Sequence, residues 1–227
     1  MSSLTAKLPT ETQQAERRHV MVEEQLRRRG VLSPQVLKAM DRVPRHEFVG
    51  EQQQALAYAD QPLQIGENQT ISQPYMVAAM TEALELTAGE NVLEVGTGSG
   101  YQTAVLALLS RWVISIERHE VLAEGARERL NRLGFANITV MHGDGTLGWP
   151  EAGPYNAVLV TAGAPHVPAP LVEQLAEGGR LVIPVGGADQ QDLLRLRKTA
   201  GRVSTETLNL CRFVPLVGRH GWKQDRP

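Results

Sequence analysis

From residue 91 onward, short apolar runs alternate with stretches of helical periodicity. The apolar runs cover residues 91–95, 112–117, 138–142, 156–161 and 180–185. The helical stretches lie near residues 101–110, 120–133 and 168–176. Buried strands that alternate with helices are typical of a doubly wound α/β fold with a mostly parallel sheet. We therefore expect this fold class for the region after residue 90.

The pattern differs on both sides of this region. Two extended segments, residues 193–198 and 203–213, predict an antiparallel pair at the edge of the sheet. Ahead of the sheet, apolar positions predict a helix that ends near Gly30 and a second helix that begins at Ser33. The expected architecture is a doubly wound sheet with N-terminal helices and an antiparallel C-terminal edge pair.

The chain has 227 residues, enough to bury one sizeable core without disulfide or metal support. Residues 1–15 are polar with few apolar positions, so we expect a disordered tail there. The rest contains no internal repeat and no low-complexity linker. We therefore expect residues 16–227 to form a single domain.

Composition and charge narrow the classes of partner. The net charge of −2, from 25 acidic and 23 basic residues, provides no overall field to hold nucleic acid. The longest apolar stretch, residues 104–109, is far shorter than the ~20 residues that cross a bilayer. The six histidines are scattered without metal-ligand spacing, and Cys211 has no second cysteine to pair with. We expect a cytoplasmic monomer with no metal, no membrane and no nucleic-acid partner.

The most informative motif is VLEVGTGSG at residues 92–100. Gly96, Gly98 and Gly100 let the backbone turn tightly and approach a ligand, and the helix that follows offers free N–H groups at its start. Glu117 ends the next apolar run, 21 residues after Gly96, where an acid can accept hydrogen bonds from both ribose hydroxyls. A plain strand-to-helix turn is the alternative. With Glu117 in place, the pattern favours an adenosine-bearing cofactor.

The residues around this motif separate two cofactor classes. Glu94 favours the cationic methionine end of S-adenosylmethionine over the anionic pyrophosphate of NAD. None of the four tyrosines is followed four residues later by a lysine, so the chain lacks the Tyr-x-x-x-Lys pair that would handle a substrate hydroxyl. A methyl donor is therefore favoured, and a dehydrogenase stays as an alternative.

A second motif, QTISQPYMV at residues 69–77, precedes the helix that leads into the glycine-loop strand. Ser72, two residues before Pro74, fits an N-cap at a helix start. The same helix start would also present N–H groups and hydroxyls to a docked anion. The two interpretations of Ser72 are compatible.

Together these blocks strongly resemble the protein-L-isoaspartate (D-aspartate) O-methyltransferase family, over roughly residues 20–222. The matching blocks are residues 60–63, 70–76, 92–103, 143–145, 161–165, 178–186 and 212–216. Residues 92–103 are generic to methyltransferases, whereas residues 70–76 are specific to this family. Glu67 and Asn68 depart from the family, which often has a small or basic residue beside a glycine at that point.

The resemblance implies a Rossmann-like methyltransferase fold and a specific reaction. S-adenosyl-L-methionine would donate a methyl group to the α-carboxylate of L-isoaspartyl residues in damaged proteins and peptides. The products would be S-adenosyl-L-homocysteine and an ester that initiates repair to aspartyl. Recognition would rest on main-chain groups, because the sequence around a damaged site varies.

The resemblance also assigns site residues. Ser72 would be the active-site serine, orienting a carboxylate that is already ionised at neutral pH rather than acting as a nucleophile. The cofactor would be bordered by Gln69, Thr70, Ile71, Glu94, Gly96, Gly98, Ser99, Gly100, Glu117, Asp144 and Gly145. Within this set, Asp144 would accept from the adenine amino group, and Glu94 could serve the methionine ammonium directly or through water.

Two further functions stay open. A nucleic-acid methyltransferase typically carries an Asn/Asp-Pro-Pro-aromatic element after its fourth strand, whereas this chain has Thr-Ala-Gly-Ala at residues 161–164. A noncatalytic binder could retain the cofactor pocket as a scaffold. The intact block at residues 70–72 argues against that second alternative.

Overall fold

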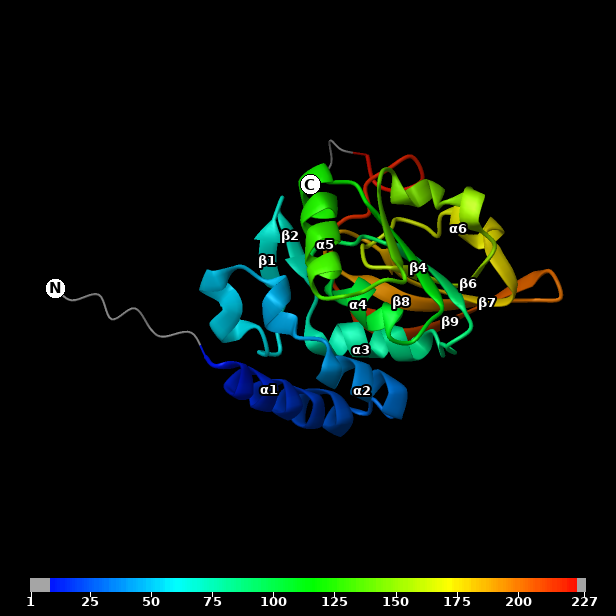
Figure 1. Ribbon diagram of the computed structural model, residues 1–227. Helices are drawn as coiled ribbons and strands as arrows, with labels where there is room; N and C mark the ends of the chain where they lie inside the picture. Colours follow the sequence, from blue (N-terminus) through cyan, green and yellow to red (C-terminus); the bar gives the residue numbers. More distant parts are fainter. Residues whose placement is uncertain (1–8, 224–227) are drawn as a thin grey trace.

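The computed structural model describes residues 9–223, and its core is a seven-stranded sheet with the order β5-β4-β3-β6-β7-β8-β9 (Figure 1). The strands are β3 (Asn91–Val95), β4 (Trp112–Glu117), β5 (Ile138–His142), β6 (Tyr155–Val160), β7 (Leu175–Gly186), β8 (Gln191–Thr199) and β9 (Arg202–Cys211). β3 to β7 pair in parallel, and β8 and β9 are antiparallel. The predicted fold class and edge pair are confirmed.

Helices cover both faces of this sheet because successive side chains of each strand point to opposite faces. In β3, Val92 packs in one cluster with Met80 and Leu106, whereas Leu93 packs in another cluster with Leu171. One face is covered by α3 (Pro74–Ala83), α4 (Tyr101–Ala107) and α5 (Glu120–Arg132), and the other by α6 (Ala169–Glu173). Both faces of β3 are therefore buried, as its almost continuous apolar run requires.

The N-terminal helices form a further layer beyond α3 (Figure 1). The helices are α1 (Glu11–Val20) and α2 (Pro34–Arg42), joined by a π-helical turn at Met21–Leu26 and a short 3₁₀ turn at Arg27–Arg29. As predicted, the first helical segment ends at Gly30, which has a left-handed φ of 92°, and Ser33 caps α2 by accepting from the N–H of Val36. A small antiparallel hairpin follows, made of β1 (Leu63–Gly66) and β2 (Gln69–Ile71).

Residues 11–15 differ from the sequence prediction. They form the beginning of α1, whereas we expected them to belong to a tail. A capping box explains the difference: the N–H of Gln13 bonds to the Thr10 hydroxyl and the N–H of Thr10 to Gln13 Oε1, at 3.3 and 2.8 Å. The first part of the predicted tail, residues 1–8, lies outside the described residues. That residues 16–227 form one domain stays a prediction.

The observed boundaries of strands and helices differ most from the predicted ones around β7. Leu175 already pairs with Tyr155, and an irregularity in the ladder separates this pair from the regular pairing at Arg180. The strand therefore takes residues that we expected in a helix over 168–176, and α6 ends at Glu173. Between residues 9 and 223, no helix is long and apolar enough to cross a bilayer.

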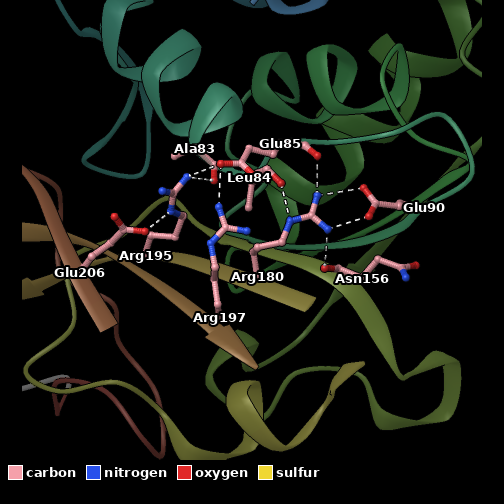
Figure 2. A network of polar contacts seen from close by, with 9 residues as sticks. All are labelled: Ala83, Leu84, Glu85, Glu90, Asn156, Arg180, Arg195, Arg197 and Glu206. Atoms are coloured by element: carbon pink, nitrogen blue, oxygen red, sulfur yellow. Dashed lines mark hydrogen bonds and ion pairs between the residues drawn. The ribbon is translucent and has the colours of Figure 1, made fainter. Parts of the chain in front are cut away.

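Ion pairs fasten the C-terminus of α3 to the sheet (Figure 2). Glu85 lies just past the helix with a φ of 49°, a left-handed conformation that favours glycine. Its Oε1 lies 2.7 Å from Arg195 Nη1 and 2.6 Å from Arg197 Nη2, both on β8. Hydrogen bonding from Arg197 lowers the pKa of Glu85 below its usual value. The ion pairs thus offset the backbone strain of a non-glycine residue at this position.

This balance predicts an order of stability among variants of residue 85. Glu85→Ala removes both ion pairs and keeps the strain, whereas Glu85→Gly removes the ion pairs and relieves the strain. Because a left-handed conformation costs a side chain about 1–2 kcal/mol, Glu85→Gly should be more stable than Glu85→Ala by about 1 kcal/mol in urea denaturation. An alanine variant as stable as the glycine variant would contradict this account.

Candidate functional site

Three adjoining cavities lie at the carboxyl ends of β3, β4 and β6, and Thr70 and Thr161 line all three. β3 and β6 are neighbours in the sheet although the chain passes through β4 and β5 between them. The order of the strands reverses at this point, which is where open α/β sheets bind ligands. The fold therefore places the candidate site at the turn after β3.

The first of these, the glycine-loop cavity, is bordered by the turn at residues 96–100. Gly96 has a φ of 99°, and a Cβ placed there would lie 2.3 Å from Thr161 Oγ1. The Thr161 hydroxyl donates to the carbonyl of Gly96 at 2.7 Å. Only glycine fits this close approach, as the sequence motif predicts.

Glu117 is fixed beside this loop. Its Oε2 accepts from the backbone N–H of Gly98 at 2.8 Å, and its Oε1 accepts from the N–H of His119 at 3.0 Å. The side chain is buried and lines the glycine-loop cavity. Each carboxylate oxygen has a further lone pair, so Glu117 can accept additional hydrogen bonds from a ligand without losing its present ones.

A C-terminal segment forms the opposite wall of the glycine-loop cavity. Residues 214–217 line it, together with Gly145. The segment is held by Trp222, whose ring N–H donates to the carbonyl of Gly163 at 2.9 Å. Gly163 also bonds through its backbone to Val214 and Leu216. The wall is thus tied to the turn after β6.

Asp144 holds this same segment and does not line the cavities. Its Oδ1 accepts from the N–H and hydroxyl of Thr146 at 2.9 and 2.7 Å, and its Oδ2 accepts from the N–H of Arg219 at 2.7 Å. A Cβ on Gly218 would lie 2.1 Å from Asp144 Oδ1, so the chain passes directly over the carboxylate. The contacts of Asp144 therefore organise the C-terminal segment.

Glu94 lies beneath the glycine loop, and its predicted contact with the methionine ammonium, directly or through water, stays a prediction. It has no exposed surface and lines none of the three cavities. Its Oε2 accepts from the hydroxyls of Thr103 and Ser115 at 2.5 and 2.6 Å, and Ser115 in turn bonds to the Thr97 hydroxyl of the glycine loop. Burial raises the pKa of the Glu94 carboxyl to about 8, so the group is mostly neutral at pH 7. Glu94 is thus linked to the glycine loop by hydrogen bonds through the Ser115 and Thr97 hydroxyls.

Ser72 lines both of the other two cavities. Ser99 also lines the smaller one, which we call the Ser72 cavity. The larger one is a wide groove of about 1120 Å³ whose other walls include Tyr75 and Phe213. The N-cap of α3 is Gln73, and no side-chain hydrogen bond caps this helix within the described chain. The interpretation of Ser72 as an N-cap is therefore not supported.

Most of the predicted site residues come together in these cavities. The residues that line at least one of them are Gln69, Thr70, Ile71, Ser72, Gly96, Gly98, Ser99, Glu117 and Gly145. Glu94, Gly100 and Asp144 do not. A Cβ on Gly100 would lie 3.4 Å from the Ala126 Cβ, so this glycine serves the packing of α4 on α5.

Sequence reasoning missed several residues of the site. Val95, Ile116 and Thr161 line the glycine-loop cavity and stand at the ends of neighbouring parallel strands. The rule that ligands bind at the carboxyl ends of such strands could have identified them. The wall at residues 214–217 gives no comparable signal, because its position depends on contacts with Gly163.

The comparisons with known proteins agree on one family. The family model for protein-L-isoaspartate(D-aspartate) O-methyltransferase matches residues 16–221. The chain is 58% identical over 204 residues to the protein-L-isoaspartate O-methyltransferase of Trichlorobacter lovleyi, covering 89% of this chain and 94% of that relative. It is 55% identical to protein-L-isoaspartate O-methyltransferase 2 of Pelobacter propionicus, covering 94% and 96% of the two chains.

Two solved structures are similar over most of the chain. A protein-L-isoaspartate O-methyltransferase superposes with a TM-score of 0.81 at 31% identity, over 91% of this chain and 67% of the other. A Plasmodium falciparum protein assigned to the same activity, in complex with S-adenosyl-L-homocysteine, gives a TM-score of 0.78 at 30% identity, over 88% and 98% of the two chains.

Gly96 provides a test of the glycine-loop cavity. Gly96→Ala places a methyl group against Thr161 and forces a side chain into a positive φ, so affinity for S-adenosylmethionine should fall at least about tenfold in calorimetric titration. Gly89→Ala is the matched control, because a Cβ at Gly89 meets nothing within 4 Å. Equal affinities of the two variants would show that the loop tolerates a side chain.

Glu94 predicts a pH dependence of stability. The pKa of its carboxyl is raised from 4.5 in the unfolded chain to about 8 in the folded protein. The protonated carboxyl therefore contributes fully to folding stability below pH 4.5, and this contribution is lost as the pH rises through 8. Glu94→Gln cannot titrate. Between pH 5.5 and 8.5, the free energy of unfolding of the unliganded wild type should fall relative to this variant by about 1–3 kcal/mol. A difference that is constant over this range would contradict the burial argument.

Proposed function

The chain belongs to the protein-L-isoaspartate(D-aspartate) O-methyltransferase family, and on this premise we propose how its residues carry out the reaction. The enzyme transfers a methyl group from S-adenosylmethionine to the α-carboxylate of L-isoaspartyl residues in damaged proteins and peptides. This methylation initiates their repair to aspartyl. The observation that carries the proposal is that Ser72 and the glycine loop line one cavity, which adjoins a wide groove.

The glycine-loop cavity fits the cofactor chemically. The carboxylate of Glu117, held by two backbone N–H groups, suits a ribose diol. Ile116, Leu216 and Val217 offer apolar walls to a flat ring such as adenine. When bound, S-adenosylmethionine supplies an electrophilic methyl group on a sulfonium.

Ser72 orients the acceptor in this proposal. A carboxylate with a pKa of about 3.5–4 is ionised at pH 7, so the protein need not remove a proton. Its tasks are to position the oxygen and to exclude water, which together can supply several kcal/mol. The Ser72 hydroxyl can donate to one carboxylate oxygen and so direct the other toward the methyl group. Ser72 is the proposed catalytic residue.

Glu94 and Asp144 support the walls of the proposed cofactor site. Glu94 holds Ser115 and, through it, Thr97, and thereby supports the shape of the glycine loop. Asp144 holds the C-terminal wall through Arg219, and its remaining lone pairs are available to an adenine amino group. Both residues stay in the proposed cofactor site as supports.

The acceptors are isoaspartyl proteins and peptides. The wide groove has room for an extended polypeptide, and its walls combine apolar and polar side chains, as recognition of the main chain in varied sequences requires. A net charge of −2 argues against a nucleic-acid partner. We further propose that the enzyme acts as a monomer in the cytoplasm, where a chain with one cysteine needs no disulfide.

Transfer of labelled methyl to paired peptides tests this function. The two peptides are identical except for one isoaspartyl or one normal aspartyl residue, and the donor is labelled S-adenosylmethionine. Label should enter the isoaspartyl peptide alone and should leave on mild alkaline treatment, as an ester does. Label on neither peptide, in a protein that binds the cofactor, would refute the proposed reaction and favour the noncatalytic binder.

Ser72→Ala separates orientation of the acceptor from cofactor binding. The rate of methyl transfer should fall at least tenfold, while the dissociation constant for S-adenosylmethionine should change less than about threefold. Stopped or quenched single-turnover assays measure the first quantity and calorimetry the second. Activity within about threefold of wild type would remove Ser72 from the catalytic role.

A further inference from the structure

We propose that Arg180, at the opposite end of the sheet from the cavities, is a positioning residue that sets the distance between Ser72 and the glycine loop. This inference rests on the proposed function, because it concerns the same acceptor and donor sites. It assigns to Arg180 a role in the rate of methyl transfer, through α3 and β3, in addition to any role in stability.

Arg180 makes an extensive set of contacts on three segments (Figure 2). Its Nε donates to the carbonyl of Leu84 at 2.5 Å, and its Nη2 donates to the carbonyl of Glu85 at 2.7 Å. Nη1 and Nη2 also bind the two carboxylate oxygens of Glu90 at 2.6 and 2.9 Å. A longer bond of 3.4 Å reaches the carbonyl of Asn156. A guanidinium is the side chain that can make this planar, forked set of bonds.

These partners belong to the far ends of the two elements that carry the site. α3 begins at Pro74, directly after Ser72 and Gln73, and runs away from the cavities to Ala83, so Leu84 and Glu85 close its far end. β3 begins at Asn91, next to Glu90, and runs back to Val95 at the glycine loop. Arg180 therefore joins the end of one element to the beginning of the other.

The two elements have similar lengths. Ten helical residues span about 15 Å, and five strand residues span about 17 Å. With one end of each fixed by Arg180, Ser72 and Gly96 meet at the other ends in a single cavity. Any slide of α3 along its axis changes the distance between them directly.

Hydrogen bonds restrain such a slide more sharply than apolar packing does. The buried face of α3 includes Val77, Ala78, Met80 and Ala83, and apolar contact is not directional. Hydrogen bonds to the terminal carbonyls have defined lengths and so fix the helix along its axis. A misplacement of about 1 Å can cost on the order of 100-fold in rate. The anchor therefore acts on the step that depends most on distance.

The charges around Arg180 are consistent with a rigid anchor. The side chains of Arg180 and Glu90 are 7% and 16% exposed. Burial raises the pKa of Glu90, but hydrogen bonds from Arg180 and Thr87 outweigh it, and the pKa is lowered overall. Glu90 is thus ionised at neutral pH, and its ion pair with Arg180 is little screened by solvent.

The test compares Arg180→Met and Arg180→Lys with the control Arg195→Met. Arg195 also donates to the carbonyl of Ala83 and pairs with Glu85, but its bonds reach no residue near β3. At a temperature where all variants are folded, Arg180→Met should lower kcat at least about tenfold and Arg180→Lys should lower it less. The control should keep kcat within about twofold. The dissociation constant for S-adenosylmethionine should change less than about threefold in all three.

A double variant distinguishes positioning from stability alone. In a Ser72→Ala background, Arg180→Met should lower the residual rate by less than about twofold, because the residue it positions is gone. Independent, multiplicative losses would overturn the proposal, as would an unchanged kcat in Arg180→Met. If Arg180→Met does not fold, Glu90→Gln replaces it in both measurements, and the same changes in kcat are expected. A wild type that cannot methylate the isoaspartyl peptide would refute the proposed function instead, which keeps the two failures apart.

Discussion

The hydrogen bond from the Gly98 N–H to Glu117 is the contact on which the site depends. It joins the turn after β3 to the end of β4 and fixes the carboxylate that faces the glycine-loop cavity. Gly96 lets the backbone turn sharply against Thr161 just ahead of this contact. The cavity is therefore defined mostly by backbone geometry at the carboxyl ends of parallel strands, and side chains adjust its chemistry.

Contacts in three places support this geometry. Beneath the glycine loop, the buried Glu94 holds hydroxyl groups that bond to the loop. Over the cavity, Asp144 and Trp222 hold the C-terminal wall. At the far end, the arginines of β7 and β8 fasten α3 (Figure 2). Residues outside the cavities thus hold the segments that line them.

The sequence predicted those features that depend on local pattern. Strand and helix order, the glycine turn and the acid at Glu117 follow from periodicity and spacing, and the structure has them in place. The roles of Glu94 and Asp144 could not be predicted in the same way, because an acid beside a ligand and an acid buried beneath it have the same sequence neighbours. The wall at residues 214–217 depends on pairing with Gly163, some 50 residues away along the chain. Residues 11–15 are a local exception, because Thr10 and Gln13 have the spacing of a capping box and so mark a helix start.

In the proposed reaction, Ser72 and the glycine loop hold acceptor and donor in one cavity. A crystal structure with S-adenosyl-L-homocysteine and an isoaspartyl peptide would show this arrangement. We expect the peptide in the wide groove, with its free α-carboxylate about 3 Å from the Ser72 hydroxyl and facing the cofactor sulfur. A carboxylate bound outside this cavity, with Ser72 turned away from it, would contradict the account.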